Sequence, residues 1–154
     1  MKPTLKNNMS HKLHTISEKE TQAEAYKLMV NMWIRHLPVV DATGKSVIGI
    51  VSDRDLLKAD SPTTPVAQLM TSPVKSFDIN TPIRKVVEAM VADKVSAFLI
   101  MENEEVAGIV TSEDMLTLLS HLLKEEKSPV LVINEILTNP IFQRTVNMAS
   151  NVGI

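Results

Sequence analysis

Residues 49–55 read GIVSDRD, and residues 108–114 read GIVTSED. Each copy follows an apolar, strand-like run and precedes a helix-like run, so one strand-to-helix junction occurs twice. The similarity extends upstream, where residues 37–41 match residues 98–102 at an offset of 61, which falls to 59 after the following turn. A repeat of this length indicates a duplicated supersecondary unit, and neither copy is expected to bury its apolar face alone. We therefore predict one domain of two halves about a pseudo-twofold axis, with two related clefts.

The composition excludes several classes of protein. The 154 residues include 16 Lys and Arg against 18 Asp and Glu, a net charge of -2, and no cysteine. Without a concentrated basic face we expect no nucleic-acid partner, and without cysteine there are no disulfides or thiolate metal sites. The sequence shows no N-terminal apolar segment of the kind found in secretion signals, and no apolar run approaches the roughly 20 residues that span a bilayer. We expect a cytoplasmic protein that does not bind membranes.

The sequence offers no support for catalysis. The four histidines, His11, His14, His36 and His121, do not have a metal-binding spacing. A phosphate-binding glycine loop, a nucleophile elbow and a pair of carboxylates set for general acid and base work are all missing. We predict that the protein is not an enzyme and needs no metal or cofactor.

Periodicity predicts the order strand-helix-strand-strand-helix in each repeat. In the first repeat the expected elements are an extended segment, a helix, two strands and a closing helix, at residues 13–16, 21–32, 37–40, 47–51 and from 53 onward. In the second repeat they are at residues 74–77, 80–92, 97–101, 106–110 and up to 123. Ser17 and Asn80 are the expected helix N-caps, and Pro38 should restrict its strand to a sheet edge or occupy the strand's first residues.

The expected boundaries place the first repeat at residues 5–60, the second at 66–123 and a tail at 124–154. The fold class is α/β, in the α+β sense, with a C-terminal tail that is helical over residues 130–137. Eight apolar residues between positions 130 and 142 make this tail too apolar for a disordered segment. We predict a homodimer to which the tail contributes; the alternative is that the tail covers its own domain.

The repeated junction places a hydroxyl and, three residues later, a carboxylate on one face of a helix start, as Ser52 with Asp55 and as Thr111 with Asp114. Backbone N–H groups at such a start form a natural phosphate site. The carboxylate is placed to accept hydrogen bonds from a ribose diol, as acidic residues do in other nucleotide sites. The alternative is that the hydroxyls cap the helices and the carboxylates favour the helix dipoles.

The chain resembles a tandem pair of CBS domains, the regulatory module named after cystathionine β-synthase. The resemblance is carried by residues 35–41 and 49–55 and their partners in the second repeat, and it covers about residues 5–121. It implies two β-α-β-β-α repeats whose sheets pack about a pseudo-twofold axis. It also implies that two clefts bind adenosine-containing ligands such as AMP, ADP, ATP or S-adenosylmethionine, and that the closing helices form a dimer face.

The same resemblance implies the residues of each cleft. One cleft would combine the acid and hydroxyl of the second repeat with residues of the first: Leu13, His14, Ile34, Arg35, His36, Thr111 and Asp114. The other would combine Ser52, Asp55, Val74, Lys75, Val95, Ser96 and Ala97. Arg35 and His36 suggest phosphate binding in the first of these, where the other has Ser96 and Ala97, with Arg54 or Lys75 as a partial substitute there; we therefore expect the Thr111/Asp114 cleft to bind more tightly. The second repeat departs from the family pattern at Leu99, which replaces the usual proline, and at Ser112 and Glu113, which replace an acidic-basic pair. Glu113 is unfavourable near phosphates in the Thr111/Asp114 cleft, which leaves open an adenosine ligand with little phosphate.

We therefore interpret the protein as a regulatory module that senses an adenosine-containing ligand and modulates a partner. The alternative is a constitutive assembly or scaffold protein whose clefts do not bind. An enzyme with an unfamiliar site is the third alternative. Ligand-dependent thermal stability separates the first two, since a ligand at about 100 times its Kd adds about 2.7 kcal/mol to the free energy of unfolding.

Overall fold

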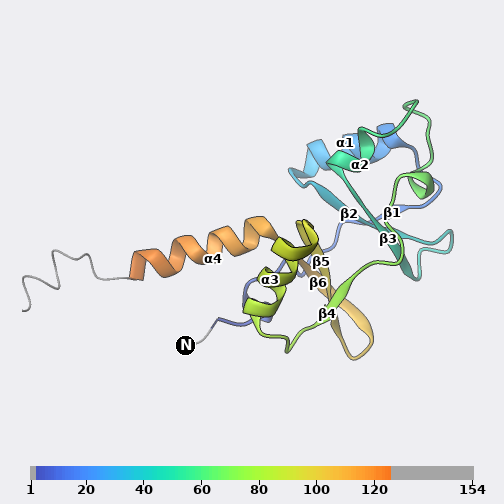
Figure 1. Ribbon diagram of the computed structural model, residues 1–154. Helices are drawn as coiled ribbons and strands as arrows, with labels where there is room; N and C mark the ends of the chain where they lie inside the picture. Colours follow the sequence, from blue (N-terminus) through green and yellow to red (C-terminus); the bar gives the residue numbers. More distant parts are fainter. Residues whose placement is uncertain (1–2, 126–154) are drawn as a thin grey trace, which may run out of the picture. The chain divides into compact units, whose positions relative to one another are not determined.

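The computed structural model describes residues 3–125 (Figure 1). One compact unit extends to Met115, and a second unit begins at Leu116. The first unit holds two three-stranded sheets, one from each repeat, and the mixed α/β fold predicted from the sequence is confirmed. Most of the tail predicted at residues 124–154, including its expected helix, lies outside the described residues.

Each repeat has the predicted order of elements. The first repeat contains η1 (Leu5–Asn7), β1 (Ile16–Ser17), α1 (Gln22–Met32), β2 (His36–Val40), β3 (Val47–Ser52) and α2 (Asp53–Leu56). The second contains η2 (Val66–Gln68), β4 (Ser76–Asp78), α3 (Ile83–Asp93), β5 (Ala97–Glu102), β6 (Glu105–Thr111) and α4 (Ser112–Glu125). The strands β1 and β4 begin two to three residues later than the periodicity suggested, because their pairing with β2 and β5 starts only there.

The two sheets have the same pairing. The first strand of each sheet runs parallel to the middle strand, and the middle strand is antiparallel to the third. Pro38 lies opposite Ile50 in the first sheet, and Leu99 lies opposite Ile109 in the second. The register also shifts at equivalent places, between Val39 and Val40 and between residues 100 and 101. The duplication is therefore retained down to the irregularities of the strands.

We expected Pro38 in an edge strand or among the first residues of its strand; it is the third residue of β2, which is the central strand of its sheet. The position tolerates proline because no neighbour needs its missing N–H group. The carbonyl of Ile50, opposite Pro38, accepts from the N–H of Thr71 at 2.8 Å and so needs no donor from β2. On the other side, the pairing of β1 with β2 begins only at Val39. A proline here removes no hydrogen bond from the sheet.

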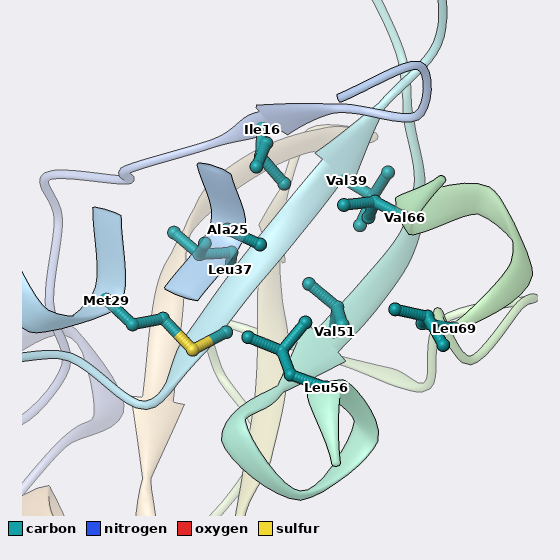
Figure 2. Close-up of a cluster of buried hydrophobic side chains, with 9 residues drawn as sticks. All are labelled: Ile16, Ala25, Met29, Leu37, Val39, Val51, Leu56, Val66 and Leu69. Atoms are coloured by element: carbon teal, nitrogen blue, oxygen red, sulfur yellow. The ribbon is translucent and has the colours of Figure 1, made fainter. Parts of the chain in front are cut away.

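Each repeat has an apolar core between its helices and its sheet. In the first repeat the inner faces of the helices and the strands meet around Met29 and Leu56 (Figure 2). The buried members of this cluster are Ile16, Ala25, Met29, Leu37, Val39, Val51, Leu56, Val66 and Leu69. The second core is built around Phe98, whose ring meets Phe77 edge-on with centroids 5.0 Å apart. Met32, the last residue of α1, is exposed rather than part of this core.

The two repeats exchange short segments across their boundary. Ser10 of the first repeat forms an antiparallel bridge with Ile109, and Thr71 of the second forms the equivalent bridge with Ile50. A third apolar cluster draws on both sheets, with Leu99 and Ile109 buried at its centre. The buried apolar surface is thus continuous from one repeat to the other, as expected of halves that do not fold alone.

The helix starts differ from the sequence-based expectation. Thr21, not Ser17, caps α1, since its Oγ1 accepts from the N–H of Glu24 at 3.4 Å and its own N–H donates to the Glu24 carboxylate at 2.8 Å. Ser17 is unavailable because it belongs to β1. In the second repeat Pro82 occupies the N-cap position of α3, and the expected cap Asn80 lies in the preceding turn.

Candidate functional site

A cavity of about 350 Å³ lies beside the start of α2 and takes its walls from both repeats. The first repeat contributes the end of β3 and the first turns that follow it. The second contributes the segment before β4 and the loop that joins α3 to β5. The lining residues are His36, Ile50, Ser52, Asp53, Arg54, Asp55, Lys58, Thr71, Pro73, Val74, Lys75, Lys94, Val95, Ser96 and Ala97.

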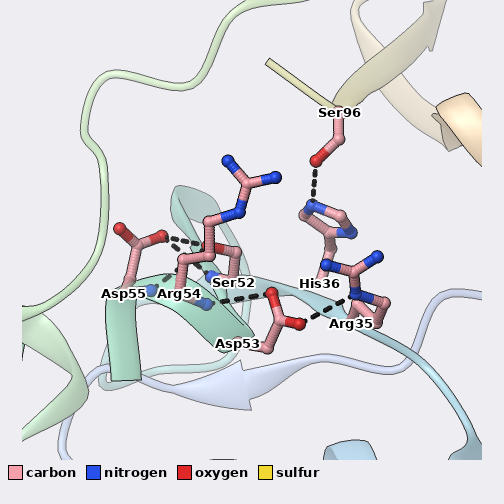
Figure 3. A network of polar contacts seen from close by, with 7 residues as sticks. All are labelled: Arg35, His36, Ser52, Asp53, Arg54, Asp55 and Ser96. Atoms are coloured by element: carbon pink, nitrogen blue, oxygen red, sulfur yellow. Dashed lines mark hydrogen bonds and ion pairs between the residues drawn. The ribbon is translucent and has the colours of Figure 1, made fainter. Parts of the chain in front are cut away.

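The carboxylate of Asp55 is held at the wall of this cavity by the hydroxyl and backbone of Ser52 (Figure 3). Its Oδ2 accepts hydrogen bonds from the N–H of Ser52 at 3.0 Å and from the Ser52 hydroxyl at 2.6 Å. Its Oδ1 pairs with the ammonium of Lys58 at 2.6 Å. Burial raises the pKa of Asp55, but the hydrogen bonds from Lys58 and Ser52 outweigh burial and lower it below the ordinary value. The group is therefore an ionised acceptor at neutral pH.

The same arrangement occurs at the second junction. The Oδ2 of Asp114 accepts from the N–H of Thr111 at 2.7 Å and from its hydroxyl at 2.8 Å. The N–H of Asp114 donates back to the Thr111 hydroxyl at 3.3 Å. Both acid–hydroxyl pairs therefore cap their helices, which was the structural alternative for the repeated motif.

The backbone N–H groups at the start of α2 do not form the expected phosphate site. The N–H of Asp53 donates to the carbonyl of Arg35 at 3.0 Å, that of Arg54 to the Asp53 carboxylate at 2.9 Å, and that of Asp55 to the Ser52 hydroxyl at 3.3 Å. Because all three donors are used within the protein, an anion in this cavity must be bound by side chains.

Arg35 is paired within its own repeat. Its Nε donates to the carboxylate of Asp53 at 2.8 Å, and this contact raises the pKa of the Arg35 guanidinium. Burial raises the pKa of Asp53, but the hydrogen bond and charge of Arg35 outweigh it and lower the pKa. The positive charge that was expected to favour phosphate in the Thr111/Asp114 cleft is therefore largely compensated.

His36 joins the two repeats at the cavity wall. Its Nε2 lies 2.8 Å from the hydroxyl of Ser96, in a half-buried contact between residues 60 positions apart (Figure 3). Burial lowers the pKa of His36. The resemblance assigned His36 to the Thr111/Asp114 cleft, but the side chain lines the cavity of Ser52 and Asp55. The reason for expecting tighter binding at Thr111 and Asp114 therefore does not hold.

The two predicted residue sets differ in how the structure arranges them. All seven residues assigned to the Ser52/Asp55 cleft line the one cavity. Of the other set, Leu13 packs into the central apolar cluster, and Ile34 packs against the core of the first repeat. His14, the residue after Leu13, is half-buried.

Several cavity residues were not in the predicted set. Lys58 lies one helical turn beyond Asp55, and Lys94 directly precedes Val95, so proximity in the sequence was a usable signal for both. Thr71 lines the cavity because it forms a β-bridge with Ile50, and local sequence patterns do not predict such a long-range contact.

Within residues 3–125, no group of three or more His, Cys, Asp or Glu side chains is placed to hold a metal ion. The same part of the chain contains no helix of sufficient length and apolar character to cross a membrane.

Comparison with known proteins identifies the family. The CBS domain family matches residues 5–62 and 66–121, and this chain belongs to that family. A Vibrio cholerae protein described as the acetoin utilization protein AcuB has the same fold, with a TM-score of 0.70 and 30% identity over 84% of this chain and 100% of that chain. The CBS domain pair of protein MJ0100, solved with 5′-methylthioadenosine and S-adenosyl-L-methionine, has a TM-score of 0.70 and 29% identity over 78% of this chain and 98% of that chain.

A curated relative is much longer than the matched region. The homoserine O-acetyltransferase of Methanohalobium evestigatum is 32% identical over 123 residues, which are 76% of this chain and 23% of that protein. The chain therefore spans less than a quarter of that relative's length.

Proposed function

We propose that this protein is a regulatory module that binds an adenosine-containing ligand in the Ser52/Asp55 cleft and thereby modulates a partner. The observation that carries the proposal is the cavity, which is lined by every residue assigned to this cleft. Because the walls come from both repeats, a bound ligand contacts both halves. A ligand that binds one arrangement of the two repeats more tightly than another shifts the equilibrium toward the first, by the difference between the two binding free energies.

The chemistry of the cavity suits an adenosine moiety. Asp55 presents Oδ1 on the side away from Ser52, and its partner there, Lys58, has a side chain that is 69% exposed. Two ribose hydroxyls can donate to this oxygen in place of the lysine, because an ionised carboxylate accepts several hydrogen bonds. Val74, Val95 and Ala97 supply apolar surface for the base. Pockets for small ligands commonly combine such apolar walls with a few polar groups that fix orientation.

The solved relative supports the ligand class, since MJ0100 was crystallised with two adenosyl compounds. The curated relative supports the kind of partner. It is an enzyme several times longer than the matched pair. We therefore propose that the partner modulated by this chain is an enzyme.

The test compares Asp55→Asn with the matched variant Asp114→Asn in titration calorimetry with adenosine and AMP. Both substitutions keep the side-chain volume and remove one carboxylate from a helix cap. Hydrogen bonds to a charged group are worth about 1.5–3 kcal/mol, so Asp55→Asn should weaken binding by roughly 10- to 150-fold. Asp114→Asn should leave the affinity for the Ser52/Asp55 cleft unchanged.

Two results would contradict the proposal. If Asp114→Asn abolishes binding and Asp55→Asn does not, the ligand occupies the other cleft. If neither compound raises the midpoint of thermal unfolding of the wild-type protein, the scaffold alternative is favoured. Thermal unfolding of both variants without ligand provides the control for folding.

A further inference from the structure

The wall of the Ser52/Asp55 cleft carries an excess of positive charge. Four lining side chains are cationic and two are anionic: Arg54, Lys58, Lys75 and Lys94 against Asp53 and Asp55. Both acids are already paired, Asp53 with Arg35 from outside the lining and Asp55 with Lys58. The acids therefore do not neutralise the remaining cations of the wall.

Two of the four lining cations, Arg54 and Lys94, have no ion-pair partner among the residues that the structure describes. Within the described residues 3–125, neither side chain forms an ion pair, whereas Lys75 pairs with Asp93 at 2.8 Å. Figure 3 shows the guanidinium of Arg54 pointing away from the carboxylates of Asp53 and Asp55. Both side chains are exposed, so neither is fixed by packing. They are free to meet a ligand that enters the cavity.

The duplication tests whether the fold itself requires these cations. The positions equivalent to Arg54 and Lys58 in the second repeat are Glu113 and Thr117, at an offset of 59. Equivalent to Lys75 and Lys94 in the first repeat are residues 14 and 33, at an offset of 61, and these are histidine and tryptophan. None of the four equivalent residues is lysine or arginine.

The local structure is nevertheless the same in both copies. Lys94 and Trp33 both end their helices in the left-handed conformation, with φ of 55° and 53°. The hydrogen bond from the Ser52 hydroxyl to the Asp55 carboxylate is matched by the one from Thr111 to Asp114. The same local geometry therefore forms without a cation at these positions, so the fold does not require the four cations.

We infer that Arg54 and Lys94 are specificity-determining residues that make the Ser52/Asp55 cleft selective for an adenosine ligand bearing a phosphate group. Each chain would bind one such ligand. The inference rests on the proposed function. A phosphate group suits this wall because Arg and Lys side chains form charge-assisted hydrogen bonds with phosphate, and the backbone donors at the start of α2 are already used. The same charges oppose a sulfonium-bearing ligand, and the Thr111/Asp114 cleft lacks them.

The test is calorimetry of the full-length chain with AMP and with adenosine, at low and at high ionic strength. We expect AMP to bind more tightly than adenosine, with one site per chain, and the difference to shrink as salt screens the exposed cations. Each of Arg54→Gln and Lys94→Gln should weaken AMP binding by about fivefold, the value of an exposed ion pair. Adenosine binding should not change in either variant.

Two controls separate charge from structure. Lys85→Gln removes a charge from an exposed position of α3 that does not line the cavity, and it should leave both affinities unchanged. Arg54→Lys keeps the charge and should keep the preference for AMP.

The outcomes distinguish this inference from the proposed function. If adenosine binds as tightly as AMP and Asp55→Asn abolishes both, the cleft binds adenosine but the inference is wrong. Two AMP sites per chain, or an unchanged AMP-to-adenosine ratio in both glutamine variants, would also overturn the inference. If neither compound binds, the inference and the proposed function fail together.

Discussion

Gly49 and Gly108 occupy equivalent positions, and replacing each by alanine probes how the repeats exchange segments. Neither residue has the left-handed φ that demands glycine, so the available space decides the cost. A Cβ at Gly108 would lie 2.6 Å from the backbone carbonyl oxygen of Ser10. A Cβ at Gly49 would instead meet the side chain of Met70, chiefly its sulfur and Cγ.

The two obstacles differ in how far they can move. Ser10 and Ile109 exchange two backbone hydrogen bonds, at 2.9 and 3.0 Å, so relief at Gly108 requires the bridge to open. Two such bonds are worth about 1–3 kcal/mol together, and displacement of the buried Met9 adds to this. Methionine can adopt other rotamers, so relief at Gly49 resembles mild overpacking, at about 1 kcal/mol. We therefore expect Gly108→Ala to cost about 3 kcal/mol of unfolding free energy and Gly49→Ala about 1 kcal/mol.

Equilibrium urea denaturation at one protein concentration measures both costs. A second substitution sharpens the comparison. Met70→Ala should offset most of the loss from Gly49→Ala, because it removes the clashing atoms. Met9→Ala should offset only a small part of the loss from Gly108→Ala, because the closer contact with the Ser10 carbonyl oxygen remains. Equal costs for the two glycines, or full rescue of Gly108→Ala by Met9→Ala, would refute the reasoning from the backbone contact.

Two further predictions concern pH and self-association. Because burial lowers the pKa of His36, the unfolded chain binds a proton more readily than the folded protein below about pH 6.5, and stability should fall as the pH drops from about 7.5 to 5.5. His36→Gln should lessen this fall in urea denaturation, and an equal fall in both proteins would contradict the assignment. We also expect light scattering to give at least a dimer at micromolar concentration, because Tyr26, Val30 and Leu57 are large apolar residues left exposed on α1 and directly after α2; a monomer would contradict this.

The order of elements could be predicted because it depends on local periodicity, and the same periodic pattern occurs in both repeats. The helix starts could not be predicted, because they depend on contacts distant in the sequence. Ser17 is a good capping residue by type, yet it pairs with Val40 in the sheet, and the cap passes to Thr21. Proline is unfavourable in a central strand because it has no N–H, yet here the N–H of Thr71 donates to the carbonyl of Ile50 opposite Pro38.

The family resemblance, rather than composition or spacing, implies that Ser52, Asp55 and Ser96 lie near one another, and all three line one cavity. The resemblance does not give the charge pairing around them. It does not reveal that Arg35 pairs with Asp53, or that His36 contacts Ser96 across the repeats. Side-chain direction decides these pairings, and it follows from tertiary packing that the sequence pattern does not encode.

Duplication changes which residues count as support for a function. The repeated motif has an aspartate in each copy, Asp55 and Asp114, and this repetition suggested a ligand-binding role for both. The structure gives both a capping role that would keep them in both copies whether or not a ligand binds. A residue present in one copy alone has no such explanation, since the other copy folds without it. Arg54 is therefore stronger support for a ligand than Asp55, although Asp55 is the residue that the repeat first brings to notice.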